Sequence, residues 1–468
     1  MSDIVILGAG VCGLAAAVVL AEDGHEVMVL ERDDETTPAS GVEAWQGWKR
    51  SGVAQFRHPH LLLAGARHVL DSHLPAVREA LTGAGGLRLD LLGWLPPPIA
   101  GSPPQPGDDR FITLTGRRPV VEYAFASVAE ELADVRRGVR VAGLLTGPSA
   151  VPSVPHVSGV RTVDGECIDA DLVIDATGRR SEAPRWLAAL GARSPLDEAE
   201  DSGFVYYSRY FHGANGYPTR QTGLNMPVGS ISLLTLPADN DTWSVTIYAS
   251  SRDRAAREFR RADVWTNVVR ACPLHAHWLH GDPISDVLAI SGTMGRCRRF
   301  IVDGVPVATG VLAVGDASAC TNPSIGRGVS LGLKHVARLR DVVRAELGNP
   351  GRLAEAWDAV TEAELTPWYR ATLDVDRPRL AEMEALIEGR PLPTPEDEAA
   401  SVRRAFLVAM AHDPDVFRAF IDTAAVLSLP QDVLTRPGLV DKIMTIAESQ
   451  DPLEIPGPTR QELVDLTR

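Results

Sequence analysis

Three glycines near the amino terminus have the spacing of a phosphate-binding turn. Gly8, Gly10 and Gly13 form a G-x-G-x-x-G pattern between a short apolar run, residues 4–7, and a run of small and apolar residues, 14–20. In such a turn the first glycine allows a tight bend, the second lets backbone approach a pyrophosphate, and the third lets helix and strand pack closely. The amides that begin the helix face the anion. The pattern therefore predicts a dinucleotide-binding site.

An acidic residue follows at the expected distance. Glu31 ends a second apolar run, residues 25–30, about twenty residues past the turn, where a carboxylate can hold the adenosine ribose hydroxyls. A carboxylate here disfavours a 2′-phosphate, so FAD or NAD is predicted in preference to NADP. Its neighbour Arg32 is also a candidate cofactor-binding residue. The alternative, a glycine-rich turn that binds nothing, is disfavoured because strand, helix, second strand and acid are in register.

Composition limits the possible partners and compartment. The chain has 468 residues, 45% of them hydrophobic, a formal net charge of −15 and five scattered cysteines. These values predict a globular protein of two or three domains or one large composite, with neither nucleic acid nor an anionic membrane as partner. Neither a disulfide framework nor a metal site is expected. No apolar run is long enough to span a membrane, and the first strand begins at Ile4, so we expect a cytoplasmic protein.

Two later segments end buried strands with polar residues. Residues 172–174 form an apolar run followed by Asp175-Ala176-Thr177-Gly178, and the segment from 310 to 343 has the pattern of strand, loop and long helix. Between them, residues 204–211 and 230–250 alternate with a period near two, which predicts an antiparallel sheet. From residue 350 onward only helical patterns appear.

Taken together, the stretches GAGVCGLAAAVVLAEDGHEVMVLER, DLVIDATGRRS and GVLAVGDASACTNPSIGRGVS resemble the FAD-dependent monooxygenases related to aromatic hydroxylases, squalene-type epoxidases and flavin halogenases. They occur in that family's order and spacing over residues 1 to about 345. The resemblance implies an α/β fold of the glutathione-reductase type, with a Rossmann-like FAD-binding domain (1–195 and 291–349). An inserted antiparallel-sheet substrate domain (196–290) and a helical carboxyl-terminal region (350–468) complete it.

The resemblance also assigns cofactor contacts. It implies that Asp316 accepts hydrogen bonds from the ribityl hydroxyls of FAD. Pro323, Gly326 and Gly328 would form a tight entry to a helix whose amides face the flavin N1 and C2 carbonyl, where reduced flavin carries negative charge. By analogy with an arginine of the family, Arg118 would meet the pyrophosphate; a solvated surface arginine is the alternative.

The second stretch departs from the family pattern. Aromatic hydroxylases have an aspartate directly before the glycine of this signature, whereas here Thr177 precedes Gly178 and the acid is Asp175. Asp175 and Gly178 remain candidate cofactor-binding residues, but the usual guide to nicotinamide docking is missing, so NADH and NADPH both stay open. The tryptophan-rich signature W-x-W-x-I-P is absent, which disfavours halogenation.

A run of basic residues supplies the candidate catalytic groups. Residues 55–60, QFRHPH, resemble the Q-x-R-H-x-H run of bacterial epoxidase-like members, which lies near the isoalloxazine. Arg57, His58 and His60 could hold a flavin C4a-hydroperoxide or relay its proton. The alternative is that these histidines only make loop hydrogen bonds.

The resemblance implies a monooxygenase, monomeric or homodimeric. FAD would be reduced by NAD(P)H as a transient donor, would react with molecular oxygen to form the C4a-hydroperoxide, and would pass one oxygen atom, as hydroxyl or epoxide, to an apolar small molecule of secondary metabolism. The alternatives are a reductase, dehydrogenase or cyclase that keeps FAD on the same fold, and a non-catalytic flavin-binding protein.

Overall fold

The apolar runs around the three signatures pair into one parallel sheet. The structure is a computed structural model and describes residues 1–395 and 397–468. The strand order is β21 (Val311–Ala313), β10 (Leu172–Asp175), β1 (Asp3–Leu7), β2 (Glu26–Glu31) and β6 (Asp134–Arg137). All four pairings are parallel. Because Leu7 lies opposite Asp175, and Asp175 opposite Ala313, the carboxyl ends of the three signature strands meet at one edge.

Alternating residues of β1 enter two different cores. Ile4 and Ile6 pack with the helices α1 (Val11–Glu22), α5 (Arg118–Leu132) and α8 (Gly328–Glu346). Val5 and Leu7 pack on the opposite face with a small antiparallel sheet. That sheet consists of β7 (Val141–Gly147), β8 (His156–Thr162) and β9 (Cys167–Asp169). A strand buried on both faces reads as an uninterrupted apolar run, which explains the sequence of β1.

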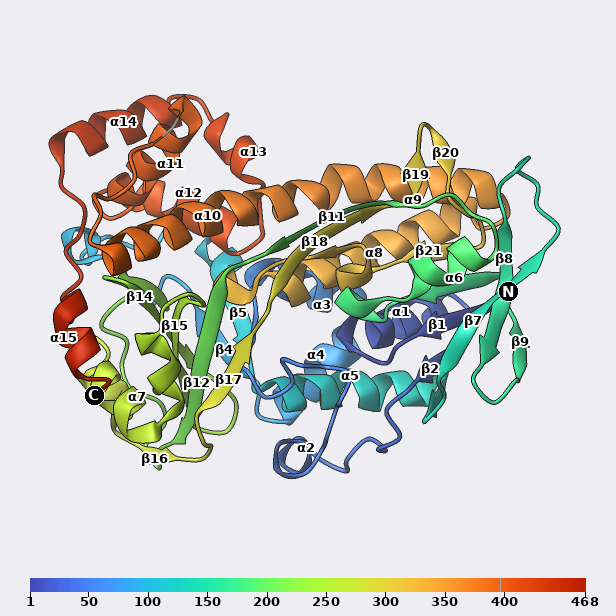
Figure 1. Cartoon of the computed structure of the whole chain (residues 1–468), viewed down its shortest axis with the longest axis horizontal. Helices are drawn as coiled ribbons and strands as arrows, with labels where there is room; N and C mark the ends of the chain where they lie inside the picture. Colours follow the sequence, from blue (N-terminus) through green and yellow to red (C-terminus); the bar gives the residue numbers. More distant parts are fainter. Residues whose placement is uncertain (396) are drawn as a thin grey trace.

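A larger antiparallel sheet forms the second part of the molecule, at the lower left of Figure 1. Its order is β13 (Asn225–Val228), β14 (Ile231–Pro237), β15 (Thr242–Ser250), β12 (Phe204–His212) and β16 (Asp282–Pro283), and β17 (Leu288–Ser291) also pairs with β12. One face packs on α7 (Ala262–Arg270) through aromatic side chains that include Tyr207 and Trp265. The period-two alternation therefore leaves the opposite face, with Tyr206, Ser208 and Tyr210, free to meet other elements.

Two long strands connect the parts. β11 (Leu196–Asp201) pairs antiparallel with β18 (Met294–Arg299), and both run from the parallel sheet toward the large antiparallel sheet (Figure 1). α10 (Thr366–Glu388) lies along them, preceded by α9 (Pro350–Glu364). Within the described residues, every element after residue 350 is a helix.

The remaining helices gather at one end of the molecule. They are α11 (Glu398–Ala409), α12 (Pro414–Ala424), α13 (Pro430–Leu434) and α14 (Leu439–Ser449), whereas α15 (Arg460–Asp465) returns to the large sheet through Leu463. All three parts of the predicted fold class are present. The boundaries predicted at 195, 290 and 349 stay predictions.

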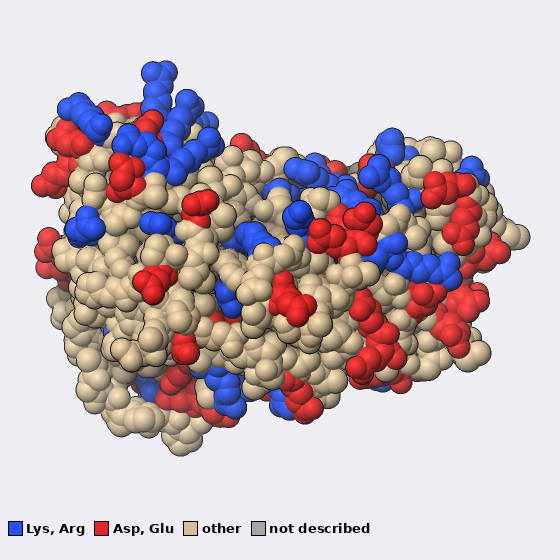
Figure 2. Space-filling view, turned by 90° about the horizontal axis from the view of Figure 1, so that it is seen from below, with Lys and Arg blue, Asp and Glu red and all other residues tan. Residues whose placement is uncertain are grey.

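On the face seen in Figure 2, uncharged residues cover much of the surface, and acidic and basic side chains are scattered among them. Across the described residues, no helix combines the length and apolar character that a membrane crossing requires.

A buried ion pair joins the parallel-sheet part to the large sheet. Arg117, just before α5, donates hydrogen bonds from its backbone N and from its guanidinium to Asp239, in the turn between β14 and β15. Both side chains are buried, and the guanidinium also stacks 4.6 Å from the Trp45 ring. A charge held this way depends on its partner, because neither group can reach water.

Removal of the Asp239 carboxylate should destabilise the protein. In Asp239→Ala the Arg117 charge stays buried without its partner, so we expect the free energy of unfolding to fall by about 3–5 kcal/mol. Glu182→Ala removes an exposed ion pair with Arg185 and should change it by less than about 1 kcal/mol. Urea unfolding followed by circular dichroism measures both; equal losses would contradict the role given to the buried pair.

Candidate FAD-binding and active site

In the glycine turn, Gly8 and Gly13 are tightly packed, whereas Gly10 borders open space. A Cβ at Gly8, where φ is +95°, would lie 2.9 Å from the Ala176 carbonyl oxygen, and a Cβ at Gly13 would lie 1.9 Å from the Gly8 carbonyl oxygen. A Cβ at Gly10 would meet no atom within 4 Å. α1 begins at Val11 without a side-chain cap, so its first amides have no partner from the helix or from a cap. This is the geometry of an anion cradle.

Glu31 reaches this turn as predicted, but it is already engaged. Its carboxylate accepts hydrogen bonds from Ala9 N at 2.8 Å, from Asp33 N at 3.0 Å and from the Arg50 guanidinium at 2.8 Å. A carboxylate accepts about four hydrogen bonds, so about one position is left for a ribose hydroxyl. Arg32, the other candidate, is exposed. Its contact with cofactor stays a prediction.

Arg50 is a residue that sequence reasoning missed. It is buried and pairs with Glu31, Asp33 and Glu122, and Glu122 accepts a second hydrogen bond from Arg118 at 2.7 Å. No local spacing connects these positions. The sequence therefore gave no means of predicting that Arg50 belongs to the site.

Arg118 is the first residue of α5 and is buried, which excludes the solvated surface arginine. Its charge lowers the pKa values of Cys12, Asp316 and His60, although burial remains the largest influence on all three. Arg118 therefore lies among the glycine turn, the third signature and the histidine run. This position suits contact with a pyrophosphate, and that contact stays a prediction.

The second and third signatures lie side by side. Gly178 has a φ of +78°, and a Cβ there would lie 3.9 Å from the Asp316 Cβ. Asp175 accepts hydrogen bonds from Thr177 N at 3.0 Å, from Thr177 Oγ1 and from Ser181 Oγ. Its carboxylate is therefore used within its own loop, where it holds the turn that presents Gly178.

The third signature ends at a second uncapped helix. Pro323 opens the short turn before Gly326, which has a φ of +70° and no neighbour within 4 Å of a Cβ, and α8 begins at Gly328 without a side-chain cap. Asp316 Oδ1 and Thr321 Oγ1 each lie 3.9 Å from a Cβ built on Gly328. We define residues 321–327 as the flavin loop.

Two polar groups face the start of α8 without strong partners. Burial raises the pKa of Asp316, against the lowering effects of the Cys320 thiol and of the Arg118 and Arg179 charges. The Thr321 hydroxyl is buried and has no hydrogen-bond partner among the described residues. Sequence reasoning missed Thr321, because its lack of a partner appears only in the folded protein.

These features fit FAD. The Gly10 cradle and Glu31 would hold the pyrophosphate and adenosine ribose, Asp316 the ribityl chain, and the first amides of α8 with Thr321 the pyrimidine edge of the flavin. The fit rests on two uncapped helix amino termini and a buried unpartnered hydroxyl at one edge of one sheet.

The side chains of the histidine run point toward two different elements. Arg57 donates hydrogen bonds to the carbonyl oxygens of Trp45 and, at 2.7 Å, Trp48, so it holds α2 (Gly41–Gln46) and the loop that follows it. His58 Nδ1 instead lies 3.3 Å from Ser208 Oγ on β12. His60 Nδ1 lies 2.8 Å from the His58 carbonyl oxygen.

Both imidazoles are neutral at pH 7. Burial lowers the pKa of His58 to about 4 and that of His60 to about 3, with the Arg118 charge adding to the effect at His60. A neutral imidazole can donate one hydrogen bond and accept another, but it carries no extra proton to release. The catalytic roles of Arg57, His58 and His60 stay predictions.

Substitutions of two glycines should separate cofactor binding from packing. In Gly10→Ala a methyl group enters the open cradle, so we expect FAD affinity to fall about tenfold or more while the unfolding free energy changes by less than about 1 kcal/mol. In Gly13→Ala the Cβ meets the Gly8 carbonyl, so the unfolding free energy should fall by about 1–3 kcal/mol or more. FAD fluorescence quenching and urea unfolding measure the two effects. Wild-type FAD affinity in Gly10→Ala would exclude the cradle.

Acid should destabilise the protein partly through His60. Its pKa falls from 6.5 to about 3 on folding, so between these values the unfolded chain binds a proton that the folded protein lacks. The free energy of unfolding should therefore fall as pH is lowered, by up to about 1.4 kcal/mol per pH unit for this group. His60→Gln should flatten the slope, and His212→Gln, at an exposed position, should not. Unfolding at pH 7, 6 and 5 gives the slopes; an unchanged slope in His60→Gln would refute the assignment.

Comparisons with known proteins agree with this geometry. Residues 3–90 match the family model described as FAD dependent oxidoreductase. The chain is 27% identical over 368 residues to Protein Rv3254 of Mycobacterium tuberculosis (strain ATCC 25618 / H37Rv), covering 73% of each chain.

Several solved structures share the fold. The Diels-Alderase PyrE3 of pyrroindomycin biosynthesis has a TM-score of 0.60 at 16% identity and covers 92% of this chain and 81% of its own. PqsL of Pseudomonas aeruginosa, a probable FAD-dependent monooxygenase, scores 0.59 at 18% identity over 83% of this chain and 97% of its own. The anhydrotetracycline hydroxylase OxyS of Streptomyces rimosus scores 0.59 at 18% identity over 91% and 76%. The expected resemblance is confirmed in sequence over residues 3–90, which match the FAD dependent oxidoreductase model, and in fold, which the chain shares with PqsL and OxyS.

Proposed function

We propose that this protein is an FAD-dependent monooxygenase that inserts one oxygen atom into an apolar small molecule, by hydroxylation or epoxidation, with NAD(P)H as reductant. One observation carries the proposal. Three segments distant along the chain meet at a single sheet edge, where two uncapped helices and Asp316 surround the place for one cofactor. Bound FAD would supply the oxygen chemistry, while the protein binds, orients and excludes water.

The site residues have distinct tasks in this proposal. The first amides of α8 stabilise negative charge on the flavin pyrimidine, and Asp316 orients the ribityl chain. Neutral His58 adds no charge where the flavin-binding part meets β12. Its Nδ1 and Ser208 Oγ share one hydrogen bond, and Ser208 Oγ lies 2.8 Å from Thr246 Oγ1, so these contacts orient His58 toward the large sheet.

The substrate class is proposed by analogy with a neighbour in fold. OxyS is a hydroxylase of anhydrotetracycline, so a polycyclic product of secondary metabolism is the proposed class. The sheet face beside the flavin loop is consistent with an uncharged surrounding: Tyr206 and Tyr248 stack with ring centroids 5.3 Å apart and are buried against Met383 of α10. Ser208 and Thr246 continue the same face.

A second candidate is a cyclase that keeps FAD but does not transfer oxygen. The similarity to the Diels-Alderase PyrE3, which covers 92% of this chain, favours this alternative over a simple reductase. Fold alone does not separate the two activities, because one fold can support several chemistries.

Dependence on oxygen distinguishes them. We expect the purified protein to release FAD on denaturation, and the intact protein to consume NAD(P)H and oxygen together when a panel of neutral polycyclic phenols is added. Mass spectrometry should find one atom from ¹⁸O₂ in the product. Product formation that continues under strict anaerobiosis would exclude the monooxygenase and favour the cyclase.

A further inference from the structure

One buried carboxylate connects the carboxyl-terminal helices to the flavin loop. Asp376 on α10 accepts a hydrogen bond on Oδ1 from Ser324 Oγ at 2.5 Å and another on Oδ2 from Asn322 Nδ2 at 2.9 Å. It is only 4% exposed, and its two donors flank Pro323. We propose that Asp376 is a positioning residue that holds the flavin loop in its FAD-binding conformation, and that its ionised form is required for tight FAD binding. The inference rests on the proposed FAD site.

The two loop residues that donate to Asp376 make further hydrogen bonds to neighbouring elements. Asn322 Oδ1 accepts hydrogen bonds from the Tyr206 hydroxyl at 2.9 Å and from Thr293 Oγ1 at 3.1 Å. The Ser324 carbonyl oxygen accepts one from Asn225 Nδ2 at 2.9 Å. With its oxygen held by two hydroxyl donors, the Asn322 amide must point its nitrogen at Asp376. The large sheet and α10 therefore both hold the loop through hydrogen bonds, and Asp376 on α10 is the charged group among these partners.

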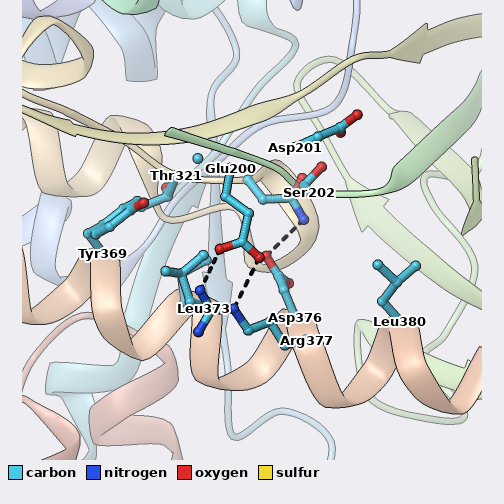
Figure 3. Close-up of a pocket in the computed structure, with 12 residues that line it drawn as sticks. Glu200, Asp201, Ser202, Thr321, Tyr369, Leu373, Asp376, Arg377 and Leu380 are labelled. Atoms are coloured by element: carbon cyan, nitrogen blue, oxygen red, sulfur yellow. Dashed lines mark hydrogen bonds and ion pairs between the residues drawn. The ribbon is translucent and has the colours of Figure 1, made fainter. Parts of the chain in front are cut away.

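A small cavity reaches the same carboxylate (Figure 3). It has a volume of about 30 Å³ and is lined by Asp376, Asn322 and Thr321, among others. Glu200 and Arg377 pair across it, with Arg377 Nε 3.0 Å from Glu200 Oε1. The space admits about one water molecule and no substrate. The cavity therefore leaves room for one water molecule beside Asp376.

Four groups on neighbouring elements set the charge around Asp376. Arg327, at the end of the flavin loop, is 4% exposed, and its Nε and Nη1 have no hydrogen-bond partner in the part of the chain that the structure describes. Glu200 on β11 repels the Asp376 carboxylate, whereas Tyr206 and Tyr248 on the sheet are neutral phenols whose pKa values are raised by burial. Arg327 is therefore the main charge that compensates an ionised Asp376.

Asp376 titrates close to physiological pH. Burial raises its pKa to about 6, against the lowering effects of the two hydrogen bonds and of the Arg327 charge. Above pH 6 the carboxylate accepts both hydrogen bonds. Below pH 6 its added proton occupies one acceptor position, and Arg327 loses its compensating charge. Protonation of Asp376 should therefore weaken its hydrogen bonding to the flavin loop.

The same charge should act on the flavin. Reduced flavin carries negative charge at its pyrimidine edge, which the flavin loop would contact, and an ionised Asp376 behind the loop disfavours that charge. Loss of the carboxylate charge should therefore favour reduction. A purely structural contact would leave the reduction potential and its pH dependence unchanged.

The test compares Asp376→Asn with Asp374→Asn, an exposed carboxylate on the same helix. Apoprotein is titrated with FAD between pH 5 and 8 by fluorescence quenching, and the midpoint potential is measured against redox dyes. We expect wild-type FAD affinity to fall about tenfold from pH 7 to pH 5. Asp376→Asn should bind about tenfold more weakly at pH 7, lack the pH step and show a more positive potential. Asp374→Asn should match the wild type.

Ser324→Ala tests the same inference without removing the carboxylate. It deletes one hydrogen bond to the charged form, so the pH step in FAD affinity should move to higher pH. If Asp376→Asn does not fold by circular dichroism, this variant alone decides. Wild-type affinity, potential and pH profile in Asp376→Asn, or an unmoved step in Ser324→Ala, would overturn the inference. If the wild type binds no FAD, the proposed function fails together with the inference; if the wild type binds FAD and consumes oxygen but Asp376→Asn behaves like it, only the inference on Asp376 fails.

Discussion

The site depends on close packing at glycines where no side chain fits. A Cβ at Gly13 would lie 1.9 Å from the Gly8 carbonyl oxygen, so α1 can begin directly at the end of β1 only with glycine there. The Cys12 sulfur in turn lies 2.8 Å and 2.3 Å from Cβ atoms built on Gly315 and Gly332, which brings α8 against α1. These contacts therefore help to set the two uncapped helix amino termini relative to each other.

Local patterns predicted the parts of the site that lie on regular elements. The glycine turn, the strand before it and Glu31 follow from periodicity and spacing within one strand-helix-strand unit, and the parallel sheet then brings Asp175 and Asp316 to the same edge. Arg50 could not be predicted in this way. Its partner Glu122 is 72 residues away, and no periodicity connects a polar loop to the middle of a helix.

In the histidine run, the sequence could not predict where each side chain points or whether it is charged. Adjacent residues suggested one cluster, but Arg57 turns toward α2 whereas His58 turns toward β12. A histidine near a reactive centre can be written as a proton relay from sequence alone. Its charge state is not visible in the sequence, because burial against the sheet lowers the pKa of His58 to about 4 and leaves a neutral ring; its catalytic role stays a prediction.

Two carboxyl-terminal helices, α9 and α10, contact the third signature at its two ends. Trp357 on α9 donates a hydrogen bond to the Ala313 carbonyl oxygen at 2.9 Å and stacks on His335, with centroids 4.0 Å apart, and His335 Nδ1 accepts from Gly315 N. α9 therefore supports the strand end of the third signature, while α10 holds its loop end through Asp376. In the proposed FAD site this signature would meet the flavin at both ends, so a region predicted from the sequence only as helical would help to position the cofactor.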